Sequence, residues 1–216
     1  MSFFAAIPEL KAIEFRLLSW SESIEDLNYT NQGETISVIA RENLLSRTYN
    51  YKGSAVLEFY RIIETEAGAQ RVPQLQTEVP EGMEEAILLI RRLEDNSLKA
   101  VWFNHSFDYT PLGTIRFHNL SSYPVALDLG DEPVMMSTRD TYAHLAPAGA
   151  RYVMLRAATA EVANEWQLFS TRPLPTQANL RTIVIMRNAR SRDAKEAGPV
   201  EMLILRDSKQ PPKQAQ

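Results

Sequence analysis

The segment Ile13-Glu-Phe-Arg-Leu-Leu-Ser19 alternates apolar and polar side chains, and a closely similar segment, Ile115-Arg-Phe-His-Asn-Leu-Ser121, follows at an offset of 102 residues. An apolar side chain at every second position is the pattern of a β-strand with one face buried and one face in water. We therefore expect a strand at both places. The offset further suggests a unit of about 100 residues that occurs twice, which is an ordinary domain size.

Later parts of the chain repeat in the same order. At an offset of 96, Gly53 and the strand after it match Gly149 and its strand, and Ala86–Arg91 matches Thr182–Arg187. The last strands return to an offset of 102 because the loop before them grows from five residues, Leu93–Ser97, to eleven in the second half. Self-similarity at a fixed period is the signature of a repeated structural unit, so we predict internal duplication.

The strand pattern predicts an all-β fold: two tandem immunoglobulin-like, Greek-key β-sandwich domains related by internal duplication, each with about seven strands. We place the first domain at residues 1–107 and the second at 108–208, and we expect the tail 209–216 to be disordered. Glu22–Leu27 and Ala158–Glu165 are each expected to hold at most a helical turn. The expected strands are Ile13–Trp20, Thr35–Arg41, Ser54–Ile63, Glu85–Leu93, Leu98–Asn104, Thr114–Leu120, Val125–Leu129, Tyr152–Ala157, Trp166–Thr171, Thr182–Asn188 and Val200–Arg206.

The closing hairpin of each half is apolar on both faces. The continuous apolar runs without alternation are Ile87–Ile90, Ala100–Phe103, Ile183–Met186 and Met202–Leu205. One face of such a strand fills a sandwich core, and the other needs cover from a loop, the second domain or a partner. We therefore expect the closing hairpins at or near an interdomain or dimer contact, with Met202 and Ile204 as candidate residues for self-association.

Composition excludes several classes of protein. The 216 residues are 44% hydrophobic and 23% charged, as in a globular protein, and the net charge of −4 argues against nucleic-acid binding. The sequence has no run of about 20 apolar residues, so we expect no transmembrane segment. Because there is no cysteine, disulfides, thiolate zinc sites and iron–sulfur clusters are excluded.

The sequence contains none of the catalytic or cofactor motifs that we sought. Gly-x-Ser-x-Gly, Gly-x-x-x-x-Gly-Lys and Gly-x-Gly-x-x-Gly are absent. His105, His118 and His144 lack the close spacing of metal ligands, and the acidic turn Asp128–Glu132 lacks the alternating carboxylates of a calcium loop. We expect no enzyme, no cofactor and no metal site. A hydrolase or metal-dependent enzyme with an interdomain site is the alternative of another class.

Two groups of residues are candidates for recognition. Tyr49 and Tyr51 flank a single asparagine, and each ring offers an apolar face with a polar hydroxyl. Arg187, Arg190 and Arg192 form a basic cluster in the loop of the second closing hairpin, where an anionic group can bind. The competing interpretations are structural: a core edge for the tyrosines and a solvated loop tip for the arginines.

Most of residues 113–207 follow one pattern. In Ile115–Gly130 a strand ends in an Asn-x-Ser turn before Pro-Val-Ala-Leu, Tyr142–Met154 contains a Pro-Ala-Gly turn, and Thr182–Ile185 and Met202–Asp207 close the unit. This pattern resembles a family of bacterial cell-surface β-sandwich repeats of uncharacterised function. The first half departs from it, with Tyr51-Lys-Gly53 at the Pro-Ala-Gly position. The resemblance implies export and a role in the cell envelope, and it brings no catalytic residues.

These observations together predict a non-enzymatic structural or recognition module of the bacterial envelope or extracellular space. The location is expected to be periplasmic or extracellular, with the cytoplasm as the alternative. Met1–Ile7 lacks the basic region of a signal peptide, so no intact one is expected in this chain. A carbohydrate or surface-polymer binding protein is the alternative among binding modules. The expected partner is another protein or a surface polymer.

Overall fold

The computed structural model describes residues 10–20, 22–130, 132–160, 165–189 and 198–208. All the regular secondary structure within these ranges is β-strand, so the all-β prediction is confirmed. The tail 209–216 lies outside the described residues. The strands are β1 Lys11–Ser19, β2 Ile24–Asn31, β3 Glu34–Ala40, β4 Thr48–Gly53, β5 Val56–Thr65, β6 Gly68–Glu78, β7 Glu85–Arg92, β8 Leu98–Asn104, β9 Thr114–Asn119, β10 Val125–Asp128, β11 Val134–Met136, β12 Thr141–Leu145, β13 Tyr152–Ala160, β14 Trp166–Pro175, β15 Leu180–Asn188 and β16 Val200–Ser208.

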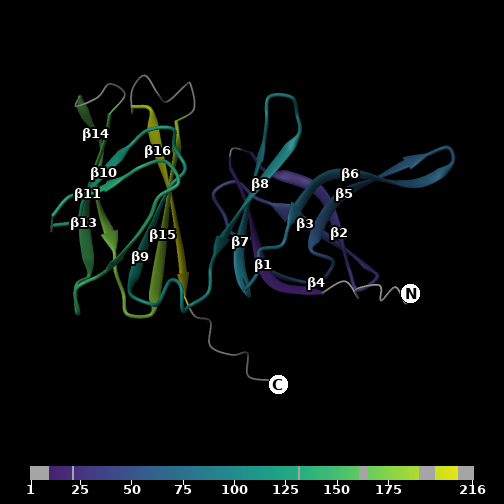
Figure 1. The fold of residues 1–216 in the computed structure, drawn as a ribbon, viewed down its shortest axis with the longest axis horizontal. Coiled ribbons are helices and arrows are strands. Elements are labelled where there is room, and N and C mark those ends of the chain that lie inside the picture. The colour runs from purple at the N-terminus through teal and green to yellow at the C-terminus, as the bar shows by residue number, and fades with distance from the viewer. Residues whose placement is uncertain (1–9, 21, 131, 161–164, 190–197, 209–216) are drawn as a thin grey trace, which may run out of the picture. The chain divides into compact units, whose positions relative to one another are not determined.

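The chain divides into two compact units between Tyr109 and Thr110. Each unit contains two four-stranded sheets (Figure 1). The strand orders are β4-β1-β7-β8 and β3-β2-β5-β6 in the first unit, and β12-β9-β15-β16 and β11-β10-β13-β14 in the second. Adding eight to every strand number of the first unit gives the second. The predicted repetition is therefore present strand by strand, and the arrangement is consistent with two β-sandwich domains.

The first strand of each unit pairs in parallel with the seventh. Phe15 lies opposite Ala86, and Phe117 lies opposite Val184. If Phe15 and Phe117 are equivalent, the counterpart of Ala86 is Val184, two residues beyond the alignment with Thr182 that the sequence pattern gave. Because side chains alternate along a strand, a shift of two leaves the same face buried. The hydrophobic pattern alone therefore does not distinguish the two alignments.

Strand β2 corrects the expected helical turn at Glu22–Leu27. Ile24 and Leu27 are three residues apart, as on a helix face, yet both are buried within a strand. A bulge between them, with Asp26 at a φ of 58°, brings both side chains to the core. The sequence pattern also failed to predict β4, β6, β11 and β12, which are short or rich in polar residues. The described part of each unit thus has eight strands rather than about seven.

Aromatic rings fill the centre of the first core. The ring centroid of Phe15 lies between 5.6 and 6.3 Å from those of Tyr29, Tyr49, Phe59 and Trp102. Aromatic pairs add about 0.5–1.5 kcal/mol each beyond the burial of the rings. These five residues come from both sheets of the unit, so their contacts hold the two sheets together.

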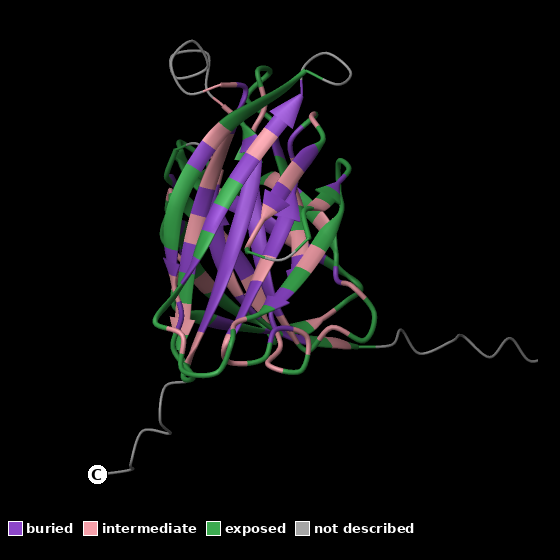
Figure 2. Ribbon diagram, turned by 90° about the vertical axis from the view of Figure 1, so that its left-hand side faces the viewer, coloured by how far each residue is buried: buried purple, intermediate pink, exposed green. Residues whose placement is uncertain are grey.

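In the second core, Phe117 stacks on Tyr142, with ring centroids 6.3 Å apart. This pair corresponds to Phe15 and Tyr49 of the first core. Buried and exposed residues alternate along many of the strands (Figure 2). The central strands β7 and β15 are the exception, because Ile87 and Ile185 are each 1% exposed although they lie on the opposite face from the core residues Leu88 and Val184. This agrees with the prediction for Ile87–Ile90 and Ile183–Met186, but not for Ala100–Phe103 on β8, where Val101 is 48% exposed. An interdomain or dimer contact there stays a prediction.

Candidate functional site

The tyrosines that the sequence singled out are core residues at the edge of two cavities. Tyr49 and Tyr51 lie on β4 and are 8% and 6% exposed. Tyr49 lines a cavity of about 400 Å³, and Tyr51 lines one of about 510 Å³. The Tyr51 hydroxyl donates to the carbonyl of Ser54 or Val56, at 3.1 and 3.2 Å. Both tyrosines therefore belong to the hydrophobic core of the first unit, and each also lines one cavity.

The larger of these two cavities has an arginine at its wall. The guanidinium carbon of Arg71, on β6, lies 4.7 Å from the ring centroid of Tyr60, on β5. Its two terminal nitrogens donate to the hydroxyls of Thr30 and Thr35, at 3.3 and 3.4 Å. The Tyr60 hydroxyl lies 3.2 Å from each of the same two hydroxyls. These contacts therefore hold the exposed Arg71 side chain in one orientation over the Tyr60 ring.

Local sequence explains why these four residues meet. Thr30 and Thr35 are a directly opposed pair at the end of the β2–β3 hairpin. Arg71 lies opposite Ile62, diagonal to Tyr60, after a bulge in the β5–β6 ladder at Phe59 and Tyr60. Diagonal neighbours on one sheet face are within reach of long and aromatic side chains. The bulge sets this register, and the hydrophobic pattern gives no sign of it.

The walls of the cavity combine apolar and polar residues and carry a net positive charge. Lys52 and Arg71 contribute two cations, and Glu58 contributes one carboxylate, which accepts a 2.6 Å hydrogen bond from Gln76. Within the described part of the chain, neither Arg71 nor Lys52 forms an ion pair. A guanidinium held in place without a carboxylate partner is suited to bind an anionic group from solution. We call this cavity the Arg71 pocket, lined by Leu10, Thr30, Gln32, Tyr51, Lys52, Gly53, Ser54, Val56, Glu58, Tyr60 and Arg71.

The other sequence candidates lie in the second unit. Arg187 is 5% exposed and its Nε donates to Glu201 at 2.5 Å, whereas Arg190 and Arg192 lie outside the described residues. Met202 and Ile204 are partly buried and pack against the hydrophobic core of the second unit. Arg187, Met202 and Ile204 thus belong to the second unit, and Tyr49 and Tyr51 to the first. Their proposed role in recognition or self-association stays a prediction.

The three histidines, His105, His118 and His144, are all buried. Burial, together with the nearby charge of Arg116, lowers the pKa of His118 to about 4, so its ring is neutral at pH 7. Its Nδ1 lies 3.2 Å from the Thr141 hydroxyl. His144 lies on β12 and is also buried. In the ranges that the structure describes, no group of three His, Asp or Glu side chains could hold a metal ion.

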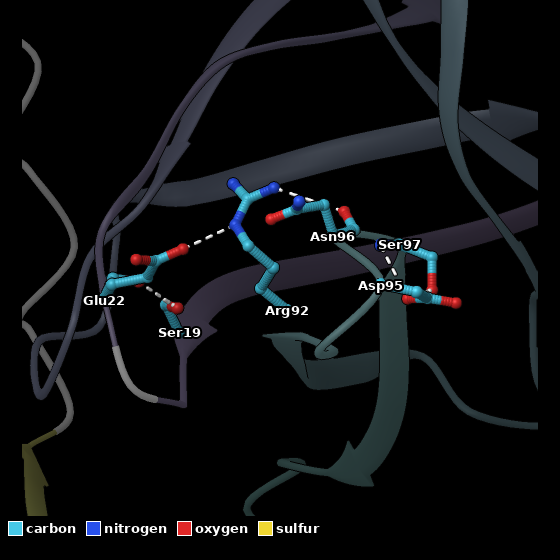
Figure 3. Close-up of polar contacts among 6 residues, drawn as sticks. All are labelled: Ser19, Glu22, Arg92, Asp95, Asn96 and Ser97. Atoms are coloured by element: carbon cyan, nitrogen blue, oxygen red, sulfur yellow. Dashed lines mark hydrogen bonds and ion pairs between the residues drawn. The ribbon is translucent and has the colours of Figure 1, made fainter.

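A third cavity, of about 540 Å³, lies beside the β7–β8 turn. Of the two arginines at this cavity, Arg91 and Arg92, the second donates to the carboxylate of Glu22 and to the carbonyl of Asn96 (Figure 3). Hydrogen bonds from the Ser97 hydroxyl and amide lower the pKa of Asp95. The Ser19 hydroxyl donates to the carbonyl of Glu22. These contacts stabilise the turn, so this cavity is a weaker candidate than the Arg71 pocket.

Comparison with known proteins adds no functional assignment. No protein-family model matches the chain, and no curated protein matches it. The resemblance of the second half to cell-surface repeats stays a prediction. Among the residues that the structure places, none forms a helix long and apolar enough to cross a membrane.

Proposed function

We propose that this protein is a non-enzymatic recognition module of the bacterial envelope or extracellular space, built from two immunoglobulin-like, Greek-key sandwiches that arose by internal duplication. The identical strand order of the two units supports the duplication. The location rests on the resemblance of the second half to cell-surface repeats. The alternative of an enzyme with a site between the two halves stays a prediction.

One observation carries the binding function: Arg71 is fixed by Tyr60, Thr30 and Thr35 at the wall of a cavity, without a carboxylate partner among the described residues. Ordering a long side chain on binding costs about 0.5–1.5 kcal/mol. Because Arg71 is already ordered, most of that cost is absent when an anion binds. The cavity of about 510 Å³ is also within the usual range of ligand sites, about 300–1,000 Å³.

The ligand that fits this chemistry is an acidic saccharide of a surface polymer. Its carboxylate binds Arg71 and Lys52. Its hydroxyl groups donate to the carboxylate of Glu58 and exchange hydrogen bonds with Gln32 and Ser54, which line the same cavity. A neutral sugar lacks the charged contact, and a simple anion lacks the hydroxyl contacts. The proposed specificity therefore requires both features in one ligand.

Calorimetric titration with trisaccharides of galacturonic acid and of galactose tests this function. We expect the acidic trisaccharide to bind, with an affinity that falls as salt is added, and Arg71→Ala to weaken it at least about tenfold. Arg47→Ala is the matched control, because Arg47 stacks on Tyr49 at 5.0 Å outside the Arg71 pocket. Equal binding of the neutral trisaccharide, or an equal loss in the two variants, would contradict the proposal.

A further inference from the structure

The outer face of the sheet β11-β10-β13-β14 carries a concentration of exposed apolar side chains. Met135, Tyr152, Met154, Trp166 and Leu168 are 41–59% exposed. Along β13 the core residues Val153, Leu155 and Ala157 alternate with Tyr152 and Met154, which places the latter on the outer face. We call these five exposed residues the outer patch.

The strand register makes part of the outer patch continuous. Met135, Ala126, Ala158 and Leu168 lie directly opposite one another across all four strands. Trp166 follows in the next row, opposite Ala160. Ala126 and Ala158, in the middle of this row, have small side chains, so the side chains of Met135 and Leu168 on either side extend further from the sheet. A bulge after Ala157 brings Leu168, rather than Phe169, to this face, while Phe169 packs against the core.

A pair of opposite charges lies inside the outer patch. Asp128 and Arg156 are neighbours in the row next to Ala126 and Ala158, and their charged groups are 3.7 Å apart. Apolar residues lie on both sides of this pair: Leu168 and Trp166 toward one end of β13, Met154 and Tyr152 toward the other. The Arg156 side chain is 62% exposed, so it remains available to a partner.

We propose that the outer patch binds a second copy of this chain, face to face. In such a dimer the two-fold axis lies between the two copies, at the level of the charge pair. It puts Arg156 of each copy next to Asp128 of the other, so the charges on one copy's face are complementary to those on the other's. Sheets that pack face to face do so through interdigitated apolar side chains. Five half-exposed large side chains supply roughly 100 Å² each, since a whole aromatic residue buries 150–250 Å². With the charge pair and its neighbours, this approaches the ~800 Å² per partner of a stable interface.

Sedimentation equilibrium of the full chain from about 5 to 500 μM tests the proposal. We expect a monomer–dimer equilibrium that Leu168→Glu weakens at least about 30-fold, because that change places a charge in the centre of the contact. Leu145→Glu is the matched control: Leu145 is 71% exposed on β12, which belongs to the other sheet of the same unit. The control is expected to dimerise like the unmodified chain.

Exchange of the charges gives a second, independent readout. Arg156→Asp sets four carboxylates against one another across the axis and is expected to abolish the dimer, whereas Arg156→Asp combined with Asp128→Arg is expected to restore it. Circular dichroism and thermal melting establish that each variant is folded. A monomer at every concentration overturns the proposal, as does a dimer that Leu168→Glu and Leu145→Glu weaken equally or that neither weakens.

Discussion

The guanidinium carbon of Arg71 lies 4.7 Å from the centre of the Tyr60 ring, and the hydroxyls of Thr30 and Thr35 lie within hydrogen-bond distance of both residues. The ring is 2% exposed and the arginine is exposed, so a buried aromatic residue supports a cation at the surface. An exposed cation–π contact contributes about 0.5–1 kcal/mol. That is enough to favour one orientation of the side chain before any ligand arrives.

The two parts of the Tyr60 side chain have separable roles. Tyr60→Phe keeps the ring beneath Arg71 and removes the hydroxyl, so we expect the free energy of unfolding to fall by about 1 kcal/mol. Binding of the acidic trisaccharide is expected to change less than about threefold, since the stacked cation remains. Urea unfolding and calorimetry measure the two effects. If Tyr60→Phe reduces the free energy of binding more than the free energy of unfolding, the hydroxyl itself contacts the ligand.

The two cores differ in their aromatic content, and this predicts unequal effects of matched substitutions. Phe15 has four aromatic neighbours, whereas Phe117 has one among the described residues. We expect Phe15→Leu to destabilise its unit by about 1–2 kcal/mol more than Phe117→Leu destabilises the other. Native-state hydrogen exchange reports the stability of each unit separately. Equal effects would mean that the rings act through their volume alone.

Asn119 holds together the start of the second unit. It is fully buried; its amide nitrogen lies within 3.2 Å of the carbonyls of Tyr123, Met136 and Ser137, and its oxygen accepts from Ser121. Asn119→Ala removes all of these hydrogen bonds together with a fully buried amide, so we expect a loss of about 3 kcal/mol in urea unfolding.

Asn188 provides the matched control for that substitution. It also bonds a serine, Ser122, through both side-chain atoms, but it is exposed. Water replaces these bonds in Asn188→Ala, and we expect a loss below about 1 kcal/mol. A similar loss in the two variants would contradict the central role of Asn119.

His118 predicts a loss of stability in mild acid. Its pKa is lowered to about 4 in the folded chain, from an ordinary value of 6.5, so the folded state disfavours the charged ring. The stabilisation is complete above pH 6.5 and is lost as the pH falls through 4, by roughly 3 kcal/mol if His118 acts alone. His118→Gln has no charge to gain. The melting temperature of the unmodified chain is therefore expected to fall more steeply between pH 6.5 and 4 than that of the variant, and parallel curves would contradict this.

Alternation and repetition were enough to predict β1 and β9, whereas β2 and β4, which also contribute to the first core, were missed. Ile13–Ser19 and its counterpart contain Phe15 and Phe117, which are the central buried rings. The alternating pattern does not reveal a strand whose pairing with its neighbour contains a bulge. At β2 the bulge beside Asp26 produces a spacing of three that looks helical, and no composition-based pattern reveals a positive φ at one aspartate.

The candidate site was predictable only in its general chemistry. The sequence indicated tyrosine-based recognition in the first half, but Tyr49 and Tyr51 are mostly buried. Tyr60 lies in an apolar run and Arg71 in a polar one, and nothing in either segment marks them as partners. Their contact depends on the bulged β5–β6 ladder, which is a property of three-dimensional pairing rather than of local sequence.

The parallel pairing of β1 with β7, and of β9 with β15, has a consequence for synthesis on the ribosome. The paired residues are about seventy positions apart, so β1 acquires its neighbour on that side after most of its unit has been made. Contacts between distant segments slow folding and leave apolar strands without partners in the meantime. A nascent chain stalled before Glu85 thus exposes the apolar edge strand that β7 later covers, and chaperones that bind such segments have their longest opportunity at that stage.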